Sequence, residues 1–238
     1  MDISRRTCLA ALAAAGVACN TQKSENQTVE LIPREVLFSD PEKAAPTISP
    51  DGKKIAWLAP SNGKRNVWVK TLGQNDDRVI TDDRKRGISI FFWQTNSQNI
   101  LHLQDTGGDE NFHLFQTDID SKTTKNLTPY EGVRAEVIAL SHKHPDEILV
   151  ALNKRNKEVF DINLKTGATR LDVQNPGDVL GWTADNNLNI RGADAVSAGM
   201  QETRVRSNDK SPWKTIKKWG FDESNGGEGA LESIVKIP

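Results

Sequence analysis

Four copies of one layout follow each other along this sequence, and such a repeat restricts the fold to architectures built from similar units. Each copy has an apolar residue, a polar turn-like cluster and then three short strand-like segments separated by turns. The copies begin at Ile48, Trp93, Leu140 and Trp182, so that successive starts lie 45, 47 and 42 residues apart. A period of about 40 to 50 residues is typical of the four-stranded blades of a β-propeller.

Short segments that alternate or are continuously apolar recur at matching places inside this period. The predicted second strands are 55–59, 100–104, 148–152 and 188–192, the third are 66–72, 112–119, 159–164 and 202–207, and the fourth are 78–81, 125–128, 168–171 and 213–217. No part of this region has a sustained helical period. We therefore predict an all-β fold, a partial β-propeller with about four blades of four antiparallel strands each.

Glycines and tryptophans fit this prediction. Gly52, Gly63 and Gly167 fall between predicted strands, where a tight turn needs a residue that accepts positive φ. Trp93 and Trp182 occupy the same repeat position, and we interpret them as core residues between blades. A stacking site for sugars or bases, as in a lectin-like propeller, is the alternative interpretation.

Two sets of motifs carry a resemblance to known families. Residues 46–60, continued by 66–70, resemble the PD40 repeat of TolB-like propellers. Residues 81–88, 104–114 and 175–179 resemble the N-terminal propeller of the prolyl oligopeptidase (S9) family of serine peptidases, in its acylaminoacyl-peptidase or dipeptidyl-aminopeptidase-like branch. The resemblance implies a propeller that caps a catalytic domain and admits short, unfolded peptides.

The resemblance, which runs from about Ile32 to about Phe221, has two departures. The third strand at 159–164 is shorter than is usual in the family, so we expect the third blade to have a damaged or shifted edge. The tail from Gly226 onward lacks the repeat pattern, and we predict no element there.

Both cysteines, Cys8 and Cys19, lie near the N-terminus, so structural disulfides, Cys-ligated zinc and a Cys nucleophile are excluded from the repeats. Arg5 and Arg6 precede an apolar run at 8–18, which resembles a twin-arginine export signal. As a helix this run would extend about 16 Å, too short to span a bilayer.

We therefore predict a signal peptide at 1–19, a polar linker at 20–31 and the propeller at 32–238. The predicted location is the bacterial periplasm or cell envelope. Residues 16–19 resemble a lipobox, so that Cys19 is either lipidated, which would hold the protein on a membrane surface, or removed with the signal.

Charge and motifs exclude several function classes. The 238 residues carry a net charge of -1, so no global field attracts nucleic acid. His142 and His144 form a pair in a polar turn without metalloprotease spacing, while His102 and His113 fall in strands of one repeat. No nucleotide-binding motif occurs. We predict no metal and no cofactor.

The catalytic domain that the resemblance implies would carry a Ser nucleophile in a Gly-x-Ser-x-Gly turn. No such motif occurs in the sequence. Only 19 residues follow Trp219, where the last repeat ends, too few for a hydrolase domain. We therefore expect no catalytic residue in this chain and no peptidase activity from the chain alone.

The best candidates for substrate binding are Asp109, Glu110 and Asn111, in a turn of the second repeat. The resemblance implies a role for them, because related exopeptidases bind the free α-amino group of the substrate with acidic residues of the propeller, through charge-assisted hydrogen bonds. A polar hairpin whose carboxylates only face water is the alternative.

Two functions remain open. The first is the non-catalytic propeller portion of an exported S9 peptidase, which gates and binds short peptides for a C-terminal hydrolase domain. The second is a free-standing TolB-like propeller that binds a protein or ligand in the cell envelope. An incomplete propeller would leave apolar blade faces uncovered, so we also expect self-association.

Overall fold

The computed structural model describes residues 31–39 and 41–221. The chain divides into two compact units, Met1–Asp40 and Pro41–Pro238. The described part of the first unit contains helix α1 (Arg34–Phe38), whose residues are all exposed. The predicted signal with Arg5, Arg6 and Cys19, the predicted linker up to residue 30, and the tail from Gly226 lie outside the described residues.

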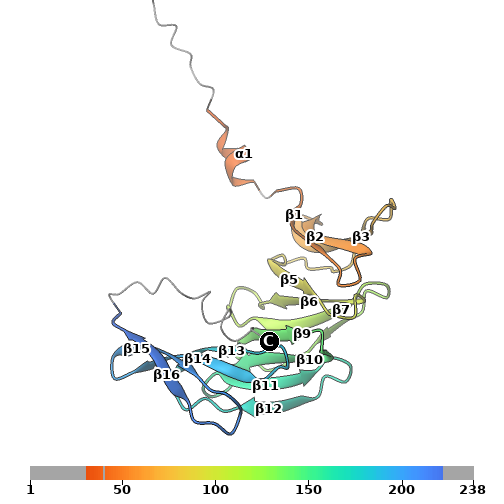
Figure 1. Cartoon of the computed structure of the whole chain (residues 1–238). Coiled ribbons are helices and arrows are strands. Elements are labelled where there is room, and N and C mark those ends of the chain that lie inside the picture. Colours follow the sequence, from red (N-terminus) through yellow and green to blue (C-terminus); the bar gives the residue numbers. More distant parts are fainter. Residues whose placement is uncertain (1–30, 40, 222–238) are drawn as a thin grey trace, which may run out of the picture. The chain divides into compact units, whose positions relative to one another are not determined.

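Four sheets form the second unit, and each consists of four consecutive strands paired antiparallel in sequence order (Figure 1). We call these sheets blades 1 to 4. Blades 1 and 2 comprise β1 (Ala44–Ile48), β2 (Lys54–Ser61), β3 (Lys64–Thr71), β4 (Arg78–Val79), β5 (Ile90–Trp93), β6 (Asn99–Gln104), β7 (His113–Asp118) and β8 (Thr124–Asn126). Blades 3 and 4 comprise β9 (Ala135–Ser141), β10 (His144–Leu152), β11 (Glu158–Asn163), β12 (Thr169–Val173), β13 (Val179–Ala184), β14 (Ile190–Ser197), β15 (Met200–Val205) and β16 (Lys214–Trp219). The predicted all-β fold of four-stranded blades is confirmed.

Neighbouring blades contact each other through their inner strands. Strand β1 contacts β5, β7 contacts β9, and β9 contacts β13, whereas each fourth strand contacts mainly the third strand of its own blade. The blades therefore diverge toward their fourth strands, as in a propeller.

Apolar side chains from neighbouring blades form three core clusters, one at each boundary between consecutive blades. Successive residues of a second strand face different boundaries: Ile100 belongs to the cluster between blades 1 and 2, and Leu101 to the cluster between blades 2 and 3. The two-residue period of a strand that is buried on both faces produces this division. Within the described residues no cluster joins blade 4 to blade 1.

The predicted turn at residues 142–144 is shorter than expected, because His144 begins β10 and pairs with Ser141. The other turns follow the sequence prediction with one exception. Asn62 and Gly63 have φ of 53° and 76°, so both central residues of this hairpin have the positive φ of a type I′ turn. The exception is Leu188, predicted to begin a strand, which has φ of 58° inside a turn. The Asp185 carboxylate accepts hydrogen bonds from the backbone N–H groups of Asn187 and Asn189 at 2.8 and 3.0 Å, which closes the turn and delays β14.

Blade 3 has all four strands, and its outer edge is irregular. Strands β11 and β12 pair with a register shift between Val159 and Phe160. The expected departure is therefore a shift at the edge of a complete sheet, and no strand of the blade is missing.

The two tryptophans at the repeat starts pack between blades. Trp93 and Trp182 are each 7% exposed. The Trp93 Nε1–H donates to the Thr47 carbonyl of blade 1 at 3.3 Å, and the Trp182 Nε1–H donates to the Lys157 carbonyl of blade 3 at 3.0 Å. This agrees with the core interpretation and leaves neither ring free to stack on a sugar.

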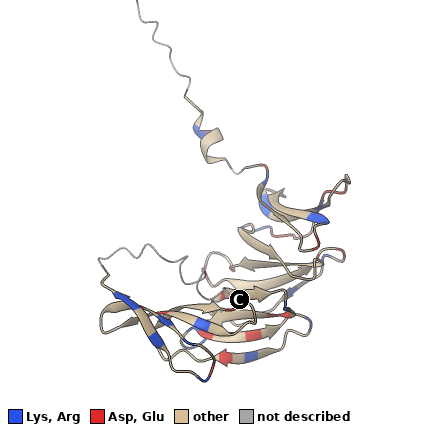
Figure 2. Ribbon diagram, viewed as in Figure 1, with Lys and Arg blue, Asp and Glu red and all other residues tan. Residues whose placement is uncertain are grey.

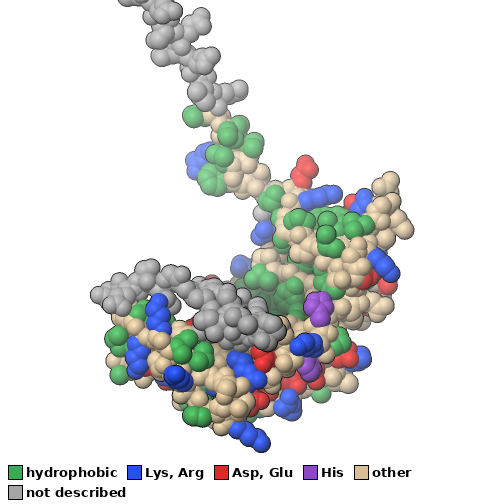
Figure 3. All heavy atoms as spheres, viewed as in Figure 1, with side chains coloured by type: hydrophobic (Ala, Val, Ile, Leu, Met, Phe, Trp, Pro, Cys, Tyr) green, Lys and Arg blue, Asp and Glu red, His purple; other side chains and the backbone are tan. Residues whose placement is uncertain are grey.

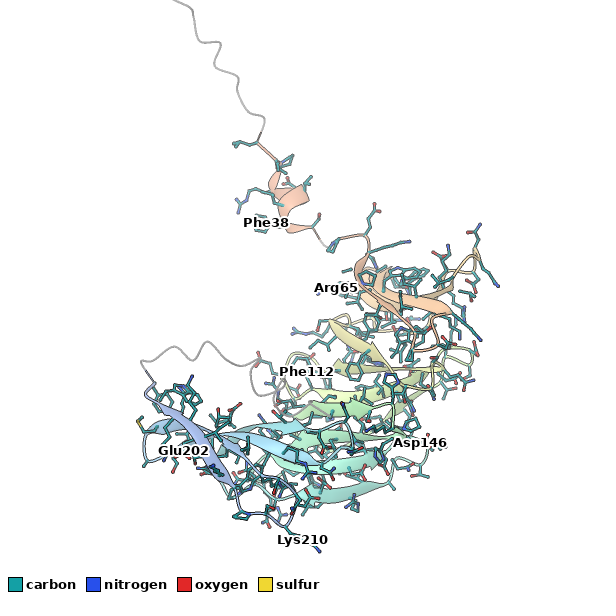
Figure 4. The ribbon with its side chains drawn as sticks, in the orientation of Figure 1. Phe38, Arg65, Phe112, Asp146, Glu202 and Lys210 are labelled. Atoms are coloured by element: carbon teal, nitrogen blue, oxygen red, sulfur yellow. The ribbon has the colours of Figure 1, made fainter. Side chains whose placement is uncertain are left out.

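A buried carboxylate ties together the last two strands of blade 4. Glu202, labelled in Figure 4, is 3% exposed on β15. Its carboxylate accepts hydrogen bonds from Lys218 at 2.5 Å and from Arg204 and Thr215 at 3.0 Å each. The bonds from Lys218 and Arg204 lower the pKa of Glu202 to about 2, so this carboxylate stays ionised well into the acid range.

Candidate functional site

The predicted binding residues lie in the loop that joins β6 to β7 in blade 2. Asp105 begins the loop and is 8% exposed; its Oδ1 lies 3.6 Å from the Arg86 Nε. Its Oδ2 accepts the backbone N–H of Glu110 at 3.4 Å. These contacts hold the loop against the connection that leads from blade 1 to blade 2.

The Asp109 side chain is used within the loop. Its Oδ1 accepts the backbone N–H groups of Asn111 at 3.1 Å and Thr106 at 3.3 Å, and its Oδ2 accepts the Asn111 side-chain amide at 3.3 Å. Desolvation would raise the pKa of Asp109, but the hydrogen bonds from Asn111 and Thr106 outweigh it and lower the pKa. The side chains of Asp109 and Asn111 therefore bond to each other and stabilise the turn, so the Asp109 carboxylate is already engaged within the loop.

Glu110 differs from its two neighbours. Its backbone has φ of 59°, in the left-handed region, and its side chain is exposed. The Glu110 carboxylate has no ion pair or hydrogen bond with any residue that the structure describes. Of the three predicted residues, Glu110 alone presents an unused carboxylate.

Glycine is required where the loop meets the neighbouring connection. Gly108 has φ of 93°, and a Cβ at this position would lie 3.0 Å from the Arg86 Nη1. A side chain here would therefore strain the backbone and displace the guanidinium. The adjacent Gly107 also has positive φ, 71°.

The four histidines do not form a common site. His102 on β6 is 4% exposed and stacks on Phe115 with ring centroids 5.3 Å apart, whereas His113 on β7 meets the edge of the same ring at 6.5 Å. His144 lies 3.3 Å from Glu147 at the exposed start of β10. Among residues 31–39 and 41–221, no group of three or more His, Cys, Asp or Glu side chains could hold a metal ion.

Sequence reasoning missed a cavity of about 560 Å³ between the outer parts of blades 1 and 2. Its lining includes Val79, Ile88, His102 and Phe115, and it reaches the start of the β6–β7 loop at Asp105. No local motif marks this cavity, because its walls come from segments that are distant in the sequence. The one signal in the sequence was His102, which stands between Leu101 and Leu103. A histidine inside an apolar strand does not by itself distinguish a core residue from a binding residue.

The charged residues of the described chain are mixed in sign. Lys and Arg as well as Asp and Glu occur on the blades (Figure 2), and many of them form exposed ion pairs, such as Lys165 with Asp146 at 2.6 Å. Among the described residues there is also no helix of the length and apolarity needed to cross a bilayer.

Known proteins share this architecture. The solved structure of TolB from Acinetobacter baumannii superimposes with a TM-score of 0.52 at 16% identity, over 78% of this chain and 45% of TolB. The β-propeller domain of the trilobed protease from Pyrococcus furiosus gives a TM-score of 0.50 at 17% identity, over 73% of this chain and 56% of that domain. The class defined by this fold is the β-propeller of TolB and of peptidase propeller domains.

Sequence comparison finds a relative among the peptidases. Dipeptidyl aminopeptidase BIII from Pseudoxanthomonas mexicana is 38% identical over 198 residues, which cover 82% of this chain and 29% of that enzyme. The chain is therefore a homologue of part of this S9-family peptidase, and its fold is that of TolB and of peptidase propeller domains. It spans less than a third of the length of this relative. No family model matches the chain.

Proposed function

We propose that the chain is the non-catalytic propeller portion of an exported S9-type serine peptidase and that it admits and positions short peptides. The observation that carries this proposal is the 38% identity to dipeptidyl aminopeptidase BIII over 198 residues. A propeller that caps a catalytic domain would favour short, unfolded chains, because folded proteins are too wide to enter between its blades and that domain.

The β6–β7 loop supports a binding role for Glu110. Its carboxylate is exposed and unused among the described residues, whereas Asp109 is engaged by Asn111 and Thr106. A free carboxylate can hold the α-ammonium group of a peptide through charge-assisted hydrogen bonds. Glu110 would thus select peptides with a free N-terminus.

The test compares two probes on the purified chain. Gly-Phe amide carries an α-ammonium group, and N-acetyl-Gly-Phe amide lacks it. We expect the first to bind more tightly by about fivefold or more, and Glu110→Gln to remove this difference. Glu131→Gln is the matched control, because Glu131 is an exposed carboxylate of the connection between blades 2 and 3. Equal binding of both probes would overturn the role of Glu110.

Catalysis is tested separately. The sequence contains no Gly-x-Ser-x-Gly motif, so the purified chain should release no p-nitroaniline from aminoacyl or dipeptidyl p-nitroanilides. Hydrolysis that survives further purification would contradict the non-catalytic assignment.

Export is part of the same proposal. Arg5→Lys combined with Arg6→Lys should keep the protein in the cytoplasm of a bacterial host, because twin-arginine signals need both arginines. Cys19→Ala should prevent the incorporation of labelled palmitate if Cys19 is the lipidated residue. Periplasmic recovery of the double-lysine variant at the unchanged level would refute the twin-arginine route.

A second candidate is a free-standing TolB-like module that binds a protein or ligand in the cell envelope. The structural likeness to TolB favours it, with a TM-score of 0.52 over 78% of this chain. Under this alternative the purified chain should be a monomer that melts in one cooperative transition, because a self-sufficient module needs no further domain.

A further inference from the structure

The cavity between blades 1 and 2 has the size and composition of a ligand site. Its volume of about 560 Å³ falls in the range of roughly 300 to 1,000 Å³ that is usual for small-molecule pockets. Val79, Ile80, Ile88 and Phe115 give it an apolar and aromatic wall. Val79 comes from blade 1 and Phe115 from blade 2. The cavity lies between the outer strands of these blades, where the blades diverge.

A polar group without a partner lies in this wall. His102 lines the cavity and is 4% exposed, and its ring stacks on Phe115 at an interplanar angle of 14°. Its buried Nδ1 has no hydrogen-bond partner within the part of the chain that the structure describes. Buried polar atoms are seldom left without a hydrogen-bond partner, so this unpaired ring nitrogen sets His102 apart from an ordinary core residue.

The carboxylates of the cavity lining all have partners within the protein. Asp82 forms an ion pair with Arg84 at 2.8 Å, and the Asp105 Oδ1 lies 3.6 Å from the Arg86 Nε. The Asp83 carboxylate accepts the backbone N–H groups of Lys85 and Arg86 at 3.3 and 3.0 Å.

Two ammonium groups at the cavity have no partner. Lys85 and Lys122 both line it and are exposed, and neither side chain forms an ion pair or hydrogen bond with the described residues. They are thus the charged groups of this lining that remain available to a ligand. An apolar, aromatic wall combined with free ammonium groups suits an anion that has an apolar body.

We propose that this cavity binds a small carboxylate with an aromatic or apolar body, of about the size of a dipeptide. The ligand carboxylate contacts Lys85 or Lys122, and its apolar body lies against Phe115 and Ile88. Such a carboxylate is either the C-terminus of a short peptide or a non-peptide aromatic acid. This inference does not rest on the peptidase proposal, because the cavity is separate from the exposed Glu110 carboxylate.

Two matched pairs of probes test the site on the full chain by titration calorimetry. One pair is N-acetyl-Phe-Gly and its C-terminal amide, and the other is 3-phenylpropionate and 3-phenylpropionamide. We expect at least one carboxylate to bind about tenfold or more tightly than its own amide, because only the carboxylate pairs with an ammonium group. The pair that shows this difference identifies the source of the carboxylate. Failure of both carboxylates to bind, or equal binding of acid and amide, would overturn the proposal.

Variants locate the binding within the molecule. Lys85→Met combined with Lys122→Met should weaken carboxylate binding about tenfold, whereas Lys53→Met, an exposed lysine outside the cavity, should leave it unchanged. Both variants change only exposed side chains, so loss of folding is not expected. The imidazole resonances of His102 should also shift with the carboxylate. Unchanged binding by the double variant would place the ligand elsewhere and refute the site.

Discussion

Two threonines close the fourth strands of blades 1 and 2 in the same way. The Thr81 hydroxyl accepts the backbone N–H of Val67 at 2.9 Å, and the Thr128 hydroxyl accepts that of Leu114 at 2.9 Å. In the sequence, Leu114 follows Val67 by 47 residues and Thr128 follows Thr81 by 47 residues. The same hydrogen bond is therefore repeated at equivalent positions of the two blades. Both threonines are buried, and the backbone N–H of the third strand depends on them.

Replacing either threonine by valine should therefore destabilise the fold. Thr81→Val and Thr128→Val each leave a buried N–H without an acceptor, which costs about 1 to 3 kcal/mol of unfolding free energy. Urea denaturation measures this loss, with Thr106→Val as an exposed control. A loss no larger than that of the control would show that water replaces the hydroxyl.

The ionisation of His102 should make stability depend on pH. Burial lowers the pKa of His102 from 6.5 to about 4, although the nearby Asp83 opposes the shift. Because the folded pKa lies below the unfolded value, the folded protein loses stability as the pH falls from 6.5 toward 4. The loss amounts to about 3 kcal/mol. His102→Phe should remove this part of the pH dependence in urea denaturation at pH 7 and pH 4, and an identical dependence in the variant would contradict the assignment.

At the scale of elements, Trp182 of β13 stabilises the contact between blades 3 and 4. Its ring belongs to the cluster between these blades, and its Nε1–H donates to the Lys157 carbonyl. Trp182→Ala should cost about 3 to 5 kcal/mol through the cavity that it leaves, and Trp182→Phe about 1 to 2 kcal/mol. Chemical denaturation of both variants checks this order. Equal costs for the two would show that packing against blade 3 contributes little.

Strands and turns could be predicted where they depend on the local residue pattern. Strand positions followed from two-residue periodicity, and the Asn62–Gly63 hairpin followed from its turn residues. Leu188 was misassigned because an apolar residue after a turn reads as a strand start, whereas the Asp185 side chain extends the turn through Asn189. The Asp109–Asn111 loop was located, but its division into turn-forming and free carboxylates depends on hydrogen-bond geometry that the sequence does not display.

At the scale of the whole molecule, three clusters connect four blades in series. The repeat period predicted this arrangement, but the cavity between blades 1 and 2 could not be predicted, because no sequence period reports how far blades diverge. Hydrophobic side chains gather on the visible surface of blade 1 (Figure 3). Separately, Ile48 and Leu72 of this blade are 63% and 47% exposed. Ile216 of blade 4 is 45% exposed.

These exposed apolar residues underlie the proposed self-association. The weight-average mass in sedimentation velocity should rise as the protein concentration is raised, because association removes apolar surface from water. Ile216→Lys should reduce the effect, since a charge resists burial in an apolar contact. A constant monomer mass over a hundredfold range of concentration, about 1 to 100 μM, would contradict this expectation.

Whether this propeller serves a serine peptidase can be tested on the coding sequence immediately downstream of Pro238. Reading that sequence should reveal a Gly-x-Ser-x-Gly motif, in frame or one frameshift away, followed by Asp and His in a hydrolase-like segment. A downstream sequence with no such motif in any frame would contradict the peptidase assignment and favour the free-standing TolB-like module.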